Sequence, residues 1–392
     1  MITPNNFTGS DSSKISAAIA AAAASGENRV VLQMRRADAY SNRDFWLIDE
    51  AILLPENMEL VIDNCKIKLS DSARDNFIRS ANCGLGITDI PAVKNIRITG
   101  IGNAVLEGAD HPRATGDANK TLGARSYGTD AGKENEKQTG DWRNVGILLT
   151  KAENFSISNL LLRNYHCWGI SLEKCAYGRV ENIRFDTREK QLIDNVWYSV
   201  LNQDGLDIRK GSHHITVENI TGTVGDDLVA LTAIHPEYRE AGNLVYTEVS
   251  GCPDPLTAND IHDITLKHLH GTSSGGHHIL RLLNTCGLKL YNVSIEDVCD
   301  TSSNNHTQNA VAVKIGDKNQ AYGGLTPLGD TYNITLKNVD SRAKRCVWLA
   351  GSLCDAVMTD ICNRNPECSA VEILQGSDSI SNVKIENCRD CF

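Results

Sequence analysis

The segment His214-Ile-Thr-Val-Glu-Asn-Ile220 has close copies at Asp263-Ile-Thr-Leu-Lys-His-Leu269 and Asn333-Ile-Thr-Leu-Lys-Asn-Val339. In each copy apolar residues alternate with polar ones, a period of two that is typical of a strand with one buried face. A polar residue, usually asparagine, closes the strand. The same template recurs over residues 154–160, 288–293 and 380–387. One strand pattern repeated along a chain predicts a repeat architecture.

The spacing of the closing residue indicates how long one repeat is. It falls at Asn159, Asn182, Asn219, His268, Asn292, Asn338, Asp360 and Asn387, in steps of 23, 37, 49, 24, 46, 22 and 27. We interpret 22 to 27 residues as one coil and the 46 and 49 steps as about two. The 37 step fits one coil plus an insertion, or two short coils. Stacked coils of this length predict a parallel β-helix, in which neighbours bury each other's inward faces.

Asparagine suits a repeated turn because it tolerates a left-handed φ and its amide pairs with asparagines of the coils above and below. A leucine-rich horseshoe would need a helix in every unit, and these units leave no room for one. The fold class predicted is therefore all-β, a single solenoid domain over residues 1–392.

The chain begins with a segment of a different kind. Ile15, Ile19 and Ala22 repeat on one face of an alanine-rich run that Asp11 or Ser12 would cap and Gly26 would end. We predict an N-terminal cap with a helix over residues 1–30. Long polar stretches at 103–145 and 232–262 are predicted loops over the binding face, where solenoid insertions commonly lie; for 128–140 a surface linker is the alternative.

Composition narrows the possible partners. The formal net charge is −10 and no basic run occurs, which argues against nucleic acid. No run of about 18 apolar residues exists, so we expect no membrane span. The first residues lack a signal-peptide pattern, which favours a cytoplasmic protein; a secreted protein whose signal has been removed is the alternative. Oligomeric state is left open.

Thirteen cysteines are scattered and odd in number, a pattern that favours reduced, structural thiols over a disulfide scaffold. Local bridges between Cys362 and Cys368, or between Cys388 and Cys391, are the alternative. No Cys or His pairs at ligand spacing indicate zinc, and we expect no cofactor.

The chemistry is concentrated in two turns one coil apart. Asn202-Gln-Asp-Gly-Leu-Asp-Ile208 is followed by Gly225-Asp-Asp-Leu228, which separates Asp204 from Asp226 and Asp227 by 22 and 23 residues. Adjacent strands lie about 4.8 Å apart, so three carboxylates would share one patch. Their repulsion raises at least one pKa and leaves others ionised, which provides an acid and a base. With room for a water, such carboxylates suit inverting glycoside hydrolysis. A calcium site is the competing interpretation.

These motifs resemble those of the polygalacturonase family, glycoside hydrolase family 28. Asn202-x-Asp204-Gly205-x-Asp207 and Gly225-Asp226-Asp227 are similar to its Asn-Thr-Asp-Gly and Asp-Asp motifs. Leu160–Leu172 is similar to its segment ahead of the active site, and Ile98-Thr-Gly-Ile-Gly-Asn to its early glycine-rich turn. The similarity covers roughly residues 95–340 and implies a right-handed, pectin-lyase-like β-helix. It implies Asp226 as general acid, with Asp204 and Asp227 activating water.

The resemblance also implies substrate-binding residues. Gly276-His277-His278 is similar to the family's Gly-His-Gly, which makes His277 the matched histidine, expected to contact the acid or the sugar. Ala312-Val313-Lys314 stands where the family has Arg-Ile-Lys, so Lys314 is kept and the arginine is absent. This departure puts galacturonan itself in doubt. The full substrate-binding set expected is Asn202, His277, Lys314, Arg281, Trp168 and His278.

Aromatic rings can also bind sugars by stacking, and Trp168, Trp197 and Tyr198 are the candidates. Trp168, on the coil before the first catalytic strand, is preferred. The function predicted is an inverting glycoside hydrolase acting on a uronic-acid-containing or related plant-type polysaccharide, with pectin as the family's example. The alternatives are a non-catalytic carbohydrate-binding β-helix protein and a β-helix lyase or epimerase.

Overall fold

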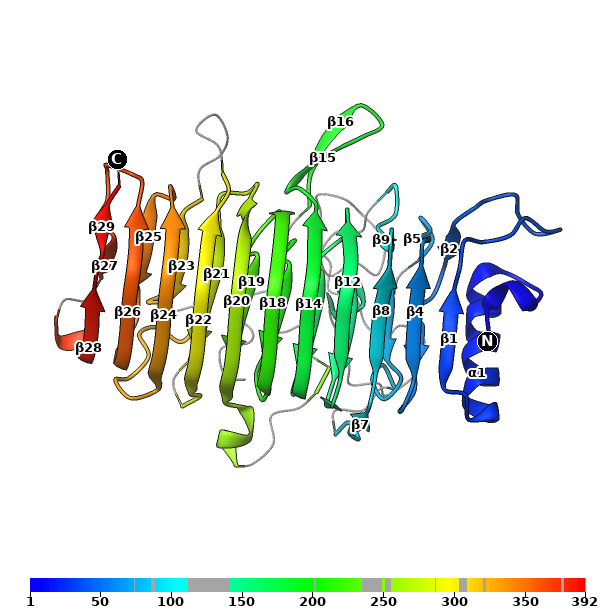
Figure 1. Ribbon diagram of the computed structural model, residues 1–392, viewed down its shortest axis with the longest axis horizontal. Helices are drawn as coiled ribbons and strands as arrows, with labels where there is room; N and C mark the ends of the chain where they lie inside the picture. The colour runs from blue at the N-terminus through cyan, green and yellow to red at the C-terminus, as the bar shows by residue number, and fades with distance from the viewer. Residues whose placement is uncertain are drawn as a thin grey trace.

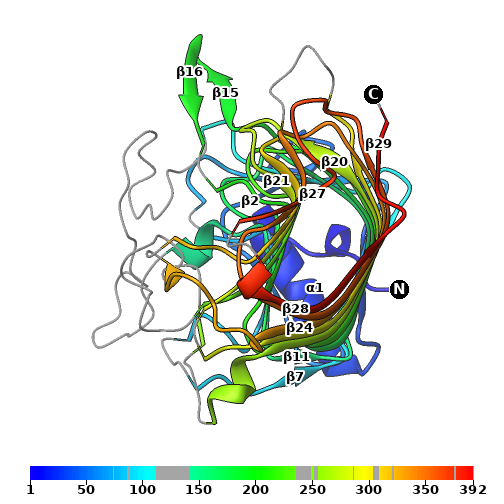
Figure 2. The ribbon, with the colours of Figure 1, turned by 90° about the vertical axis from the view of Figure 1, so that its left-hand side faces the viewer.

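A computed structural model describes residues 1–73, 75–85, 89–111, 141–200, 202–234, 249–250, 255–285, 287–302, 309–319, 322–374 and 377–391. The chain winds into a right-handed parallel β-helix whose coils stack along one axis (Figure 1). This architecture is the one predicted from the strand template. Viewed along the axis, two long sheets form the walls of the coil (Figure 2).

The larger sheet has seventeen strands, of which the six central ones from β14 to β26 are 11 to 13 residues long. In chain order they are β1 (Arg29–Leu32), β2 (Trp46–Ile48), β4 (Glu59–Asp63), β5 (Lys66–Leu69), β7 (Val93–Lys94), β8 (Arg97–Ile101), β9 (Val105–Glu107), β11 (Ala152–Glu153), β12 (Ser156–Arg163), β14 (Ala176–Asp186), β18 (His213–Val224), β20 (Ile261–Ser273), β22 (Leu290–Asp300), β24 (Thr331–Ser341), β26 (Leu353–Asn363), β28 (Ile380–Glu386) and β29 (Arg389–Asp390).

The second sheet has ten shorter strands: β3 (Ile52–Leu54), β6 (Ile78–Ser80), β10 (Ile147–Thr150), β13 (Ile170–Glu173), β17 (Leu206–Arg209), β19 (Val229–Ala233), β21 (His278–Asn284), β23 (Val311–Ile315), β25 (Arg345–Leu349) and β27 (Val371–Ile373). An antiparallel hairpin of β15 (Lys190–Ile193) and β16 (Val196–Ser199) stands apart from both sheets. Short 3₁₀ turns occur at Pro4–Asn6, Asp141–Asn144, Leu256–Asn259 and Ser377–Ser379.

The predicted N-terminal helix is α1 (Asp11–Ser25), which lies across the first coil (Figure 2). Its cap is Ser10, one residue before the predicted caps, and the Ser10 side chain accepts a hydrogen bond from the amide of Ser13. Gly26 ends the helix in a left-handed conformation, with φ of 73°. Ile15 and Ala18 are fully buried on the face toward the sheets, so the helix covers apolar surface that the first coil would expose.

Stacked aliphatic side chains fill the interior. In the second sheet Ile170, Leu206, Val229, Leu280 and Val313 occupy one register position on five consecutive strands, and all are buried. They belong to one continuous hydrophobic cluster that runs from α1 to the C-terminal coils. None of the helices in the described ranges is long and apolar enough to cross a membrane.

The side-chain hydrogen bonds between turn asparagines of successive coils, here called a turn ladder, correct the predicted number of residues per coil. Asn159, Asn182 and Asn219 are linked by side-chain hydrogen bonds of 2.9 and 2.8 Å, each with φ between 55° and 59°. However, Glu218 on β18 pairs directly with Lys267 on β20, so the 49-residue step to His268 is one coil, not two.

Asn292 belongs to a second ladder at another corner, where it bonds to Asp263 and Asn333. The residue that continues the first ladder is Asp297, which accepts from Asn338 at 3.1 Å. The 46-residue step from Asn292 to Asn338 therefore joins two different ladders and does not measure a coil. The 37-residue step is one coil with an insertion, because β14 pairs directly with β18.

The predicted loops lie largely outside the described residues, which omit 112–140, 235–248 and 251–254. Among the described cysteines, Cys362 is joined to Cys391, whereas Cys368 and Cys388 are free. The local pairs considered from the sequence are therefore not formed. Cys65, Cys83, Cys167, Cys175 and Cys346 are buried free thiols, as expected for structural cysteines.

Candidate active site

Four neighbouring strands of the second sheet, together with the turns that lead into them, carry the predicted residues other than Trp168. Strands β17, β19, β21 and β23 pair in parallel, and their register aligns Asp207, Ala230, Arg281 and Lys314 in one outward-facing row. Residues at this position alternate with the inward aliphatic stack, because successive side chains of a strand point to opposite faces. The polar groups are therefore fixed by the same register that builds the core.

Asp204 lies directly beside the coil that carries Asp226 and Asp227, as the 22-residue spacing predicted. The amide of Gly205 donates to the carbonyl of Asp227 at 2.8 Å, and the amide of Gly169 donates to the carbonyl of Asp204 at 2.9 Å. A Cβ at position 205 would lie 2.4 Å from the carbonyl oxygen of Leu228. Glycine is needed there because the coils approach too closely for a side chain.

Gln203 fixes the turn between the two motifs and was not predicted. It is fully buried, and its side-chain amide donates to the carbonyl of Tyr165 at 2.7 Å and to the hydroxyl of Thr187 at 2.8 Å. The main-chain carbonyl of Gln203 accepts hydrogen bonds from the amides of Gly225 and Asp226. The main chain of the second motif is therefore held by the first.

Asp226 and His277 form a pair at the rim of the site. The Nδ1 atom of His277 lies 3.2 Å from Oδ1 of Asp226, and the two side chains are 46% and 24% exposed. Burial, followed by the charge of Asp227, raises the pKa of Asp226 to about 7. Asp226 therefore keeps a proton at a pH where ordinary carboxyls have lost theirs, and it remains open to solvent.

Asp227 and His278 form a second pair beneath the first. The Nδ1 atom of His278 lies 2.6 Å from Oδ1 of Asp227, whose side chain is 2% exposed. The Nη1 atom of Arg281 lies 3.7 Å from Oδ2. Burial by itself raises the pKa of Asp227, but the charge and hydrogen bond of His278, with Arg281, hold it well below its usual range. Asp227 is therefore the ionised carboxylate of the pair.

The side chains of Asp204 and Asp207 are both buried, and their cationic neighbours do not offset the effect of burial on their pKa values. Burial, then the negative charges around it, raises the pKa of Asp204 well above its usual value. Burial raises the pKa of Asp207 in the same way, partly opposed by Arg209. Oδ1 of Asp204 and Oδ2 of Asp207 are buried and accept no hydrogen bond in the described part of the chain. Sequence reasoning assigned no role to Asp207. The available signal was its place in the motif, three residues after Asp204.

The two cations of the row share one acid. Arg281 Nη2 and Lys314 Nζ lie 3.1 and 2.7 Å from Oδ2 of Asp317. Burial raises the pKa of Asp317, but the hydrogen bond and charge of Lys314 and the charge of Arg281 outweigh it and lower the pKa. The ring of Trp348 lies 5.1 Å from Lys314 Nζ. Arg281 thus pairs with Lys314 on the neighbouring strand, two residues along from Ala312, where the family's arginine is absent.

Trp168 and Asn202 lie apart from these contacts. Trp168 is 1% exposed and packs in a small cluster with Trp142 and Leu148, and Arg209 lies 4.2 Å over its ring. Its ring is therefore covered by protein and offers no face to a sugar, contrary to the preference from the sequence. Asn202 has φ of 55° and sets the turn before Asp204.

A cation could contact part of this site. The ligand atoms of Asp226, Asp227 and His277 all lie within 4.8 Å of one another. However, one oxygen of Asp227 lies 2.6 Å from Nδ1 of His278 and the other lies 3.7 Å from Nη1 of Arg281. Calcium prefers a set of ionised or carbonyl oxygens, which these three groups supply poorly.

Comparison with known proteins adds one family and a set of related folds. Residues 60–237 match the model of glycosyl hydrolases family 28, just under half of the chain, with Asp204, Asp226 and Asp227 inside the match. The resemblance predicted from the motifs is thereby confirmed. No curated protein sequence matches the chain significantly.

Three solved structures illustrate the fold. The polygalacturonase from Erwinia carotovora ssp. carotovora is 14% identical, with a TM-score of 0.53 over 100% of this chain and 96% of that one. The endo-xylogalacturonan hydrolase from Aspergillus tubingensis is 15% identical, with a TM-score of 0.53 over 99% and 94%. The tailspike protein of Escherichia coli bacteriophage HK620, solved with a pentasaccharide, is 11% identical, with a TM-score of 0.52 over 100% and 64%. At these identities the likeness establishes the fold alone.

Proposed function

We propose that this chain, a polygalacturonase-like β-helix with a family 28 match over residues 60–237, hydrolyses glycosidic bonds in a pectin-type polysaccharide. The family match supports a glycoside hydrolase. The observation that carries the proposal is the contrast between two adjacent carboxyl groups. Asp226 lies at the rim beside His277 with its pKa raised to about 7, whereas His278 and Arg281 hold the pKa of the buried Asp227 well below its usual range. An acid and a base side by side are what glycoside hydrolysis requires.

In this proposal Asp226 protonates the leaving oxygen. Its side chain is partly exposed, so a substrate can reach it, and Nδ1 of His277 lies 3.2 Å from its Oδ1. A carboxyl group with a pKa of about 7 is well matched to proton transfer at neutral pH. After bond cleavage the ionised Asp226 would be stabilised by the neighbouring His277.

Asp227 accepts a proton from the attacking water, and Asp204 holds that water. Asp204 is 7% exposed and lies close enough to Asp227 for the two charges to interact, so it supplies the hydrogen-bonding position for that water. The charge and hydrogen bond of His278, with Arg281, keep Asp227 ionised until the water attacks. Attack by such a water gives inversion of the anomeric centre.

The separation of the Asp226 and Asp227 carboxyl groups favours a different outcome, retention of the anomeric configuration. The nearest oxygens of Asp226 and Asp227 lie within 4.8 Å, closer than the roughly 6.5–9.5 Å between carboxyl groups usual in inverting enzymes. Direct attack by Asp227 would instead form a covalent intermediate and retain configuration. Our proposal of inversion therefore depends on Asp204 as the third carboxyl, and product stereochemistry distinguishes the two routes.

The test is an anomeric NMR time course on pectic and hemicellulosic oligosaccharides with the wild type, Asp226→Asn and Asp89→Asn. Asp89 is a fully exposed carboxylate outside the site and serves as the control. We expect the inverted anomer first, a loss of kcat of at least about 10²-fold in Asp226→Asn, and full activity in Asp89→Asn. Retained configuration contradicts the water-attack route, and full activity in Asp226→Asn contradicts the acid assignment.

The same experiment separates the other candidates. A lyase yields an unsaturated product that absorbs in the ultraviolet, and an epimerase leaves chain length unchanged. A carbohydrate-binding protein without catalysis shows binding with no new reducing ends.

A further inference from the structure

The hairpin β15–β16 is an insertion in the coil that leads into the site. The ladder step from Asn159 to Asn182 is 23 residues and the next, to Asn219, is 37, fourteen more. The additional residues fold into the antiparallel hairpin, which projects from the stack above β14 (Figure 1). Neither sheet needs the hairpin for pairing, so its side chains are available for another task.

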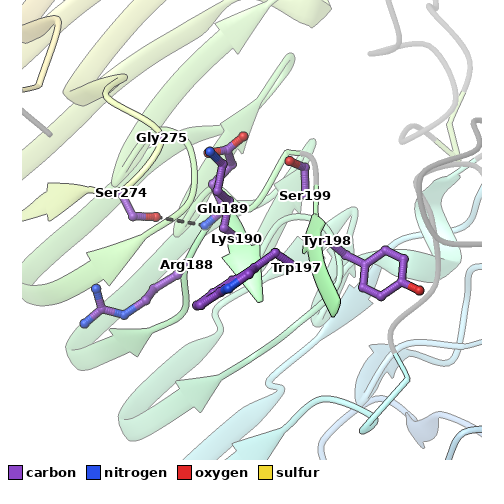
Figure 3. A pocket seen from close by; sticks show the side chains of 8 residues that line it. All are labelled: Arg188, Glu189, Lys190, Trp197, Tyr198, Ser199, Ser274 and Gly275. Atoms are coloured by element: carbon purple, nitrogen blue, oxygen red, sulfur yellow. Dashed lines mark hydrogen bonds between the residues drawn. The ribbon is translucent and has the colours of Figure 1, made fainter. Parts of the chain in front are cut away.

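One face of the hairpin carries an exposed apolar pair. Trp197 and Leu192 are cross-strand partners, 66% and 54% exposed. Figure 3 shows the ring of Trp197 on one side of β16 and the ring of Tyr198 on the other, as strand alternation requires. A tryptophan this exposed contributes little to the core, and an accessible indole face is a common platform for sugar rings.

A cavity of about 870 Å³ lies beneath Trp197. Arg188, Glu189, Lys190, Trp197, Tyr198, Ser199, Ser274 and Gly275 line it (Figure 3). Its volume is within the ~300–1,000 Å³ usual for ligand sites. Neither Arg188 nor Lys190 forms an ion pair within the described part of the chain, and Glu189 supplies the single acidic group. The lining therefore combines an aromatic face with two cations, neither of which forms an ion pair with another described residue.

The cavity is coupled to the acid through two short connections. The amide of Glu189 donates to the Ser274 hydroxyl at 2.8 Å, and that hydroxyl donates to the carbonyl of Val224 at 2.9 Å, two residues before Asp226. On the same turn, Gly275 lies against the ring of His277; a Cβ at position 275 would be 2.9 Å from its Cδ2. The His277 ring thus lies between the cavity wall and Asp226.

We propose that this cavity binds a carboxylate-bearing sugar residue of the substrate, with Trp197 stacked on the ring and Arg188 and Lys190 pairing with the carboxylate. An indole face and two free cations match the two faces of a uronic acid, an apolar ring surface and an anionic edge. The inference rests on the proposed function, because the occupant is one sugar residue of the chain cleaved at Asp226. It gives the chain an anion-binding group in addition to Lys314 and Arg281, which Asp317 partly neutralises.

The experiment measures binding without turnover. In the Asp226→Asn background, calorimetric titration with oligogalacturonates of two to six residues, and with their methyl esters, is compared for Trp197→Ala, Trp197→Phe and the double variant Arg188→Ala/Lys190→Ala. Tyr177→Ala is the control, since Tyr177 is 58% exposed on the other sheet.

We expect Trp197→Ala to weaken binding of both probes about tenfold, with partial recovery in Trp197→Phe. The double variant should weaken binding of the acid about tenfold and leave the ester nearly unchanged. Equal loss with both probes contradicts the carboxylate contact, and unchanged affinity in Trp197→Ala, or no binding of any probe, overturns the proposal. If the wild type binds these probes but cleaves none, the proposed function fails and the binding result stands.

Discussion

At the residue scale, two chemically identical side chains differ because their neighbours differ. Asp226 and Asp227 are adjacent in sequence, yet only Asp227 is enclosed by His278 and Arg281. Sequence reasoning brought the carboxyl groups together, and the family resemblance implied that His277 contacts the acid or the sugar. Without that resemblance it could not say which carboxyl group keeps its proton, because burial and charge at each oxygen depend on which side chains cross from the next coil.

The pH profile of kcat/KM should report both groups. Asp226 must be protonated, so activity should fall as pH rises through about 7, whereas loss of activity on the acidic side should begin only well below the ordinary pKa of a carboxyl group. In His278→Ala the pKa of Asp227 should rise, which moves the acidic limb to higher pH and leaves the alkaline limb in place. An unmoved acidic limb would show that His278 does not set the charge of Asp227.

Asp204→Asn should raise thermal stability at pH 7 while it removes activity. Burial raises the folded-state pKa of Asp204, so the wild type is most stable where the unfolded chain also holds this proton, and it loses stability as pH rises above about 4. Asparagine carries no such penalty. We expect a gain of about 1–3 °C in melting temperature at pH 7 and a smaller one at pH 4; a lower melting temperature at pH 7 contradicts this.

Chelation should leave hydrolysis unchanged. The oxygens of Asp227 are already engaged by a histidine and an arginine, so a calcium ion would have few ionised ligands among these groups. Initial rates before and after dialysis against EDTA provide the measurement. Loss of activity that added Ca²⁺ restores would mean that the carboxylates hold a metal.

At the element scale, the turn ladders decide how the coils stack. The strand template and the N-terminal helix could be predicted because each has a strong local period. The coil lengths could not, because Asn292 and Asn338 carry the same residue type at two different corners. Which corner an asparagine occupies depends on pairing with the neighbouring coil, and that pairing is long-range. The hairpin could not be predicted either, because one coil with an insertion and two short coils both give the 37-residue spacing between Asn182 and Asn219.

Asn182→Ala should cost about 2–4 kcal/mol of unfolding free energy. The change removes the hydrogen bond donated to Asn159 and the one accepted from Asn219. It also places alanine at φ of 55°, a left-handed conformation that asparagine tolerates better. Asn182→Gly is the matched variant, since glycine accepts this φ and loses only the hydrogen bonds. Urea denaturation measures both; equal losses would mean that backbone strain contributes nothing at this turn.

At the scale of the whole molecule, one apolar column joins both sheets and begins beneath α1. The helix completes the column at its N-terminal end, where an open coil would otherwise expose unpaired edges and aliphatic side chains. At the other end Cys391 is tied back to Cys362 on β26. The stability of the coils therefore depends on both ends as well as on each pairing.

Ala18→Asp and Ala20→Asp test the contribution of the helix. Ala18 is fully buried against the first coil and Ala20 is exposed on the same helix. A charge at position 18 should destabilise the protein by several kcal/mol, whereas the same change at position 20 should stay within about 0.5 kcal/mol. Chemical denaturation and light scattering provide the readout. Equal effects at the two positions would mean that the helix does not cover the coil.

The fourteen-residue hairpin insertion has a consequence for engineering. Direct pairing of β14 with β18 on either side of it shows that a turn can lengthen without disturbing the coils that it connects. If the hairpin binds a sugar residue as proposed, specificity and scaffold are separable: a library confined to residues 188–199 would then alter what is recognised while the pairing of β14 with β18 keeps the carboxyl groups in place. The hairpin is thus a natural acceptor site for grafted loops, and variants selected there should retain the turnover machinery of the parent.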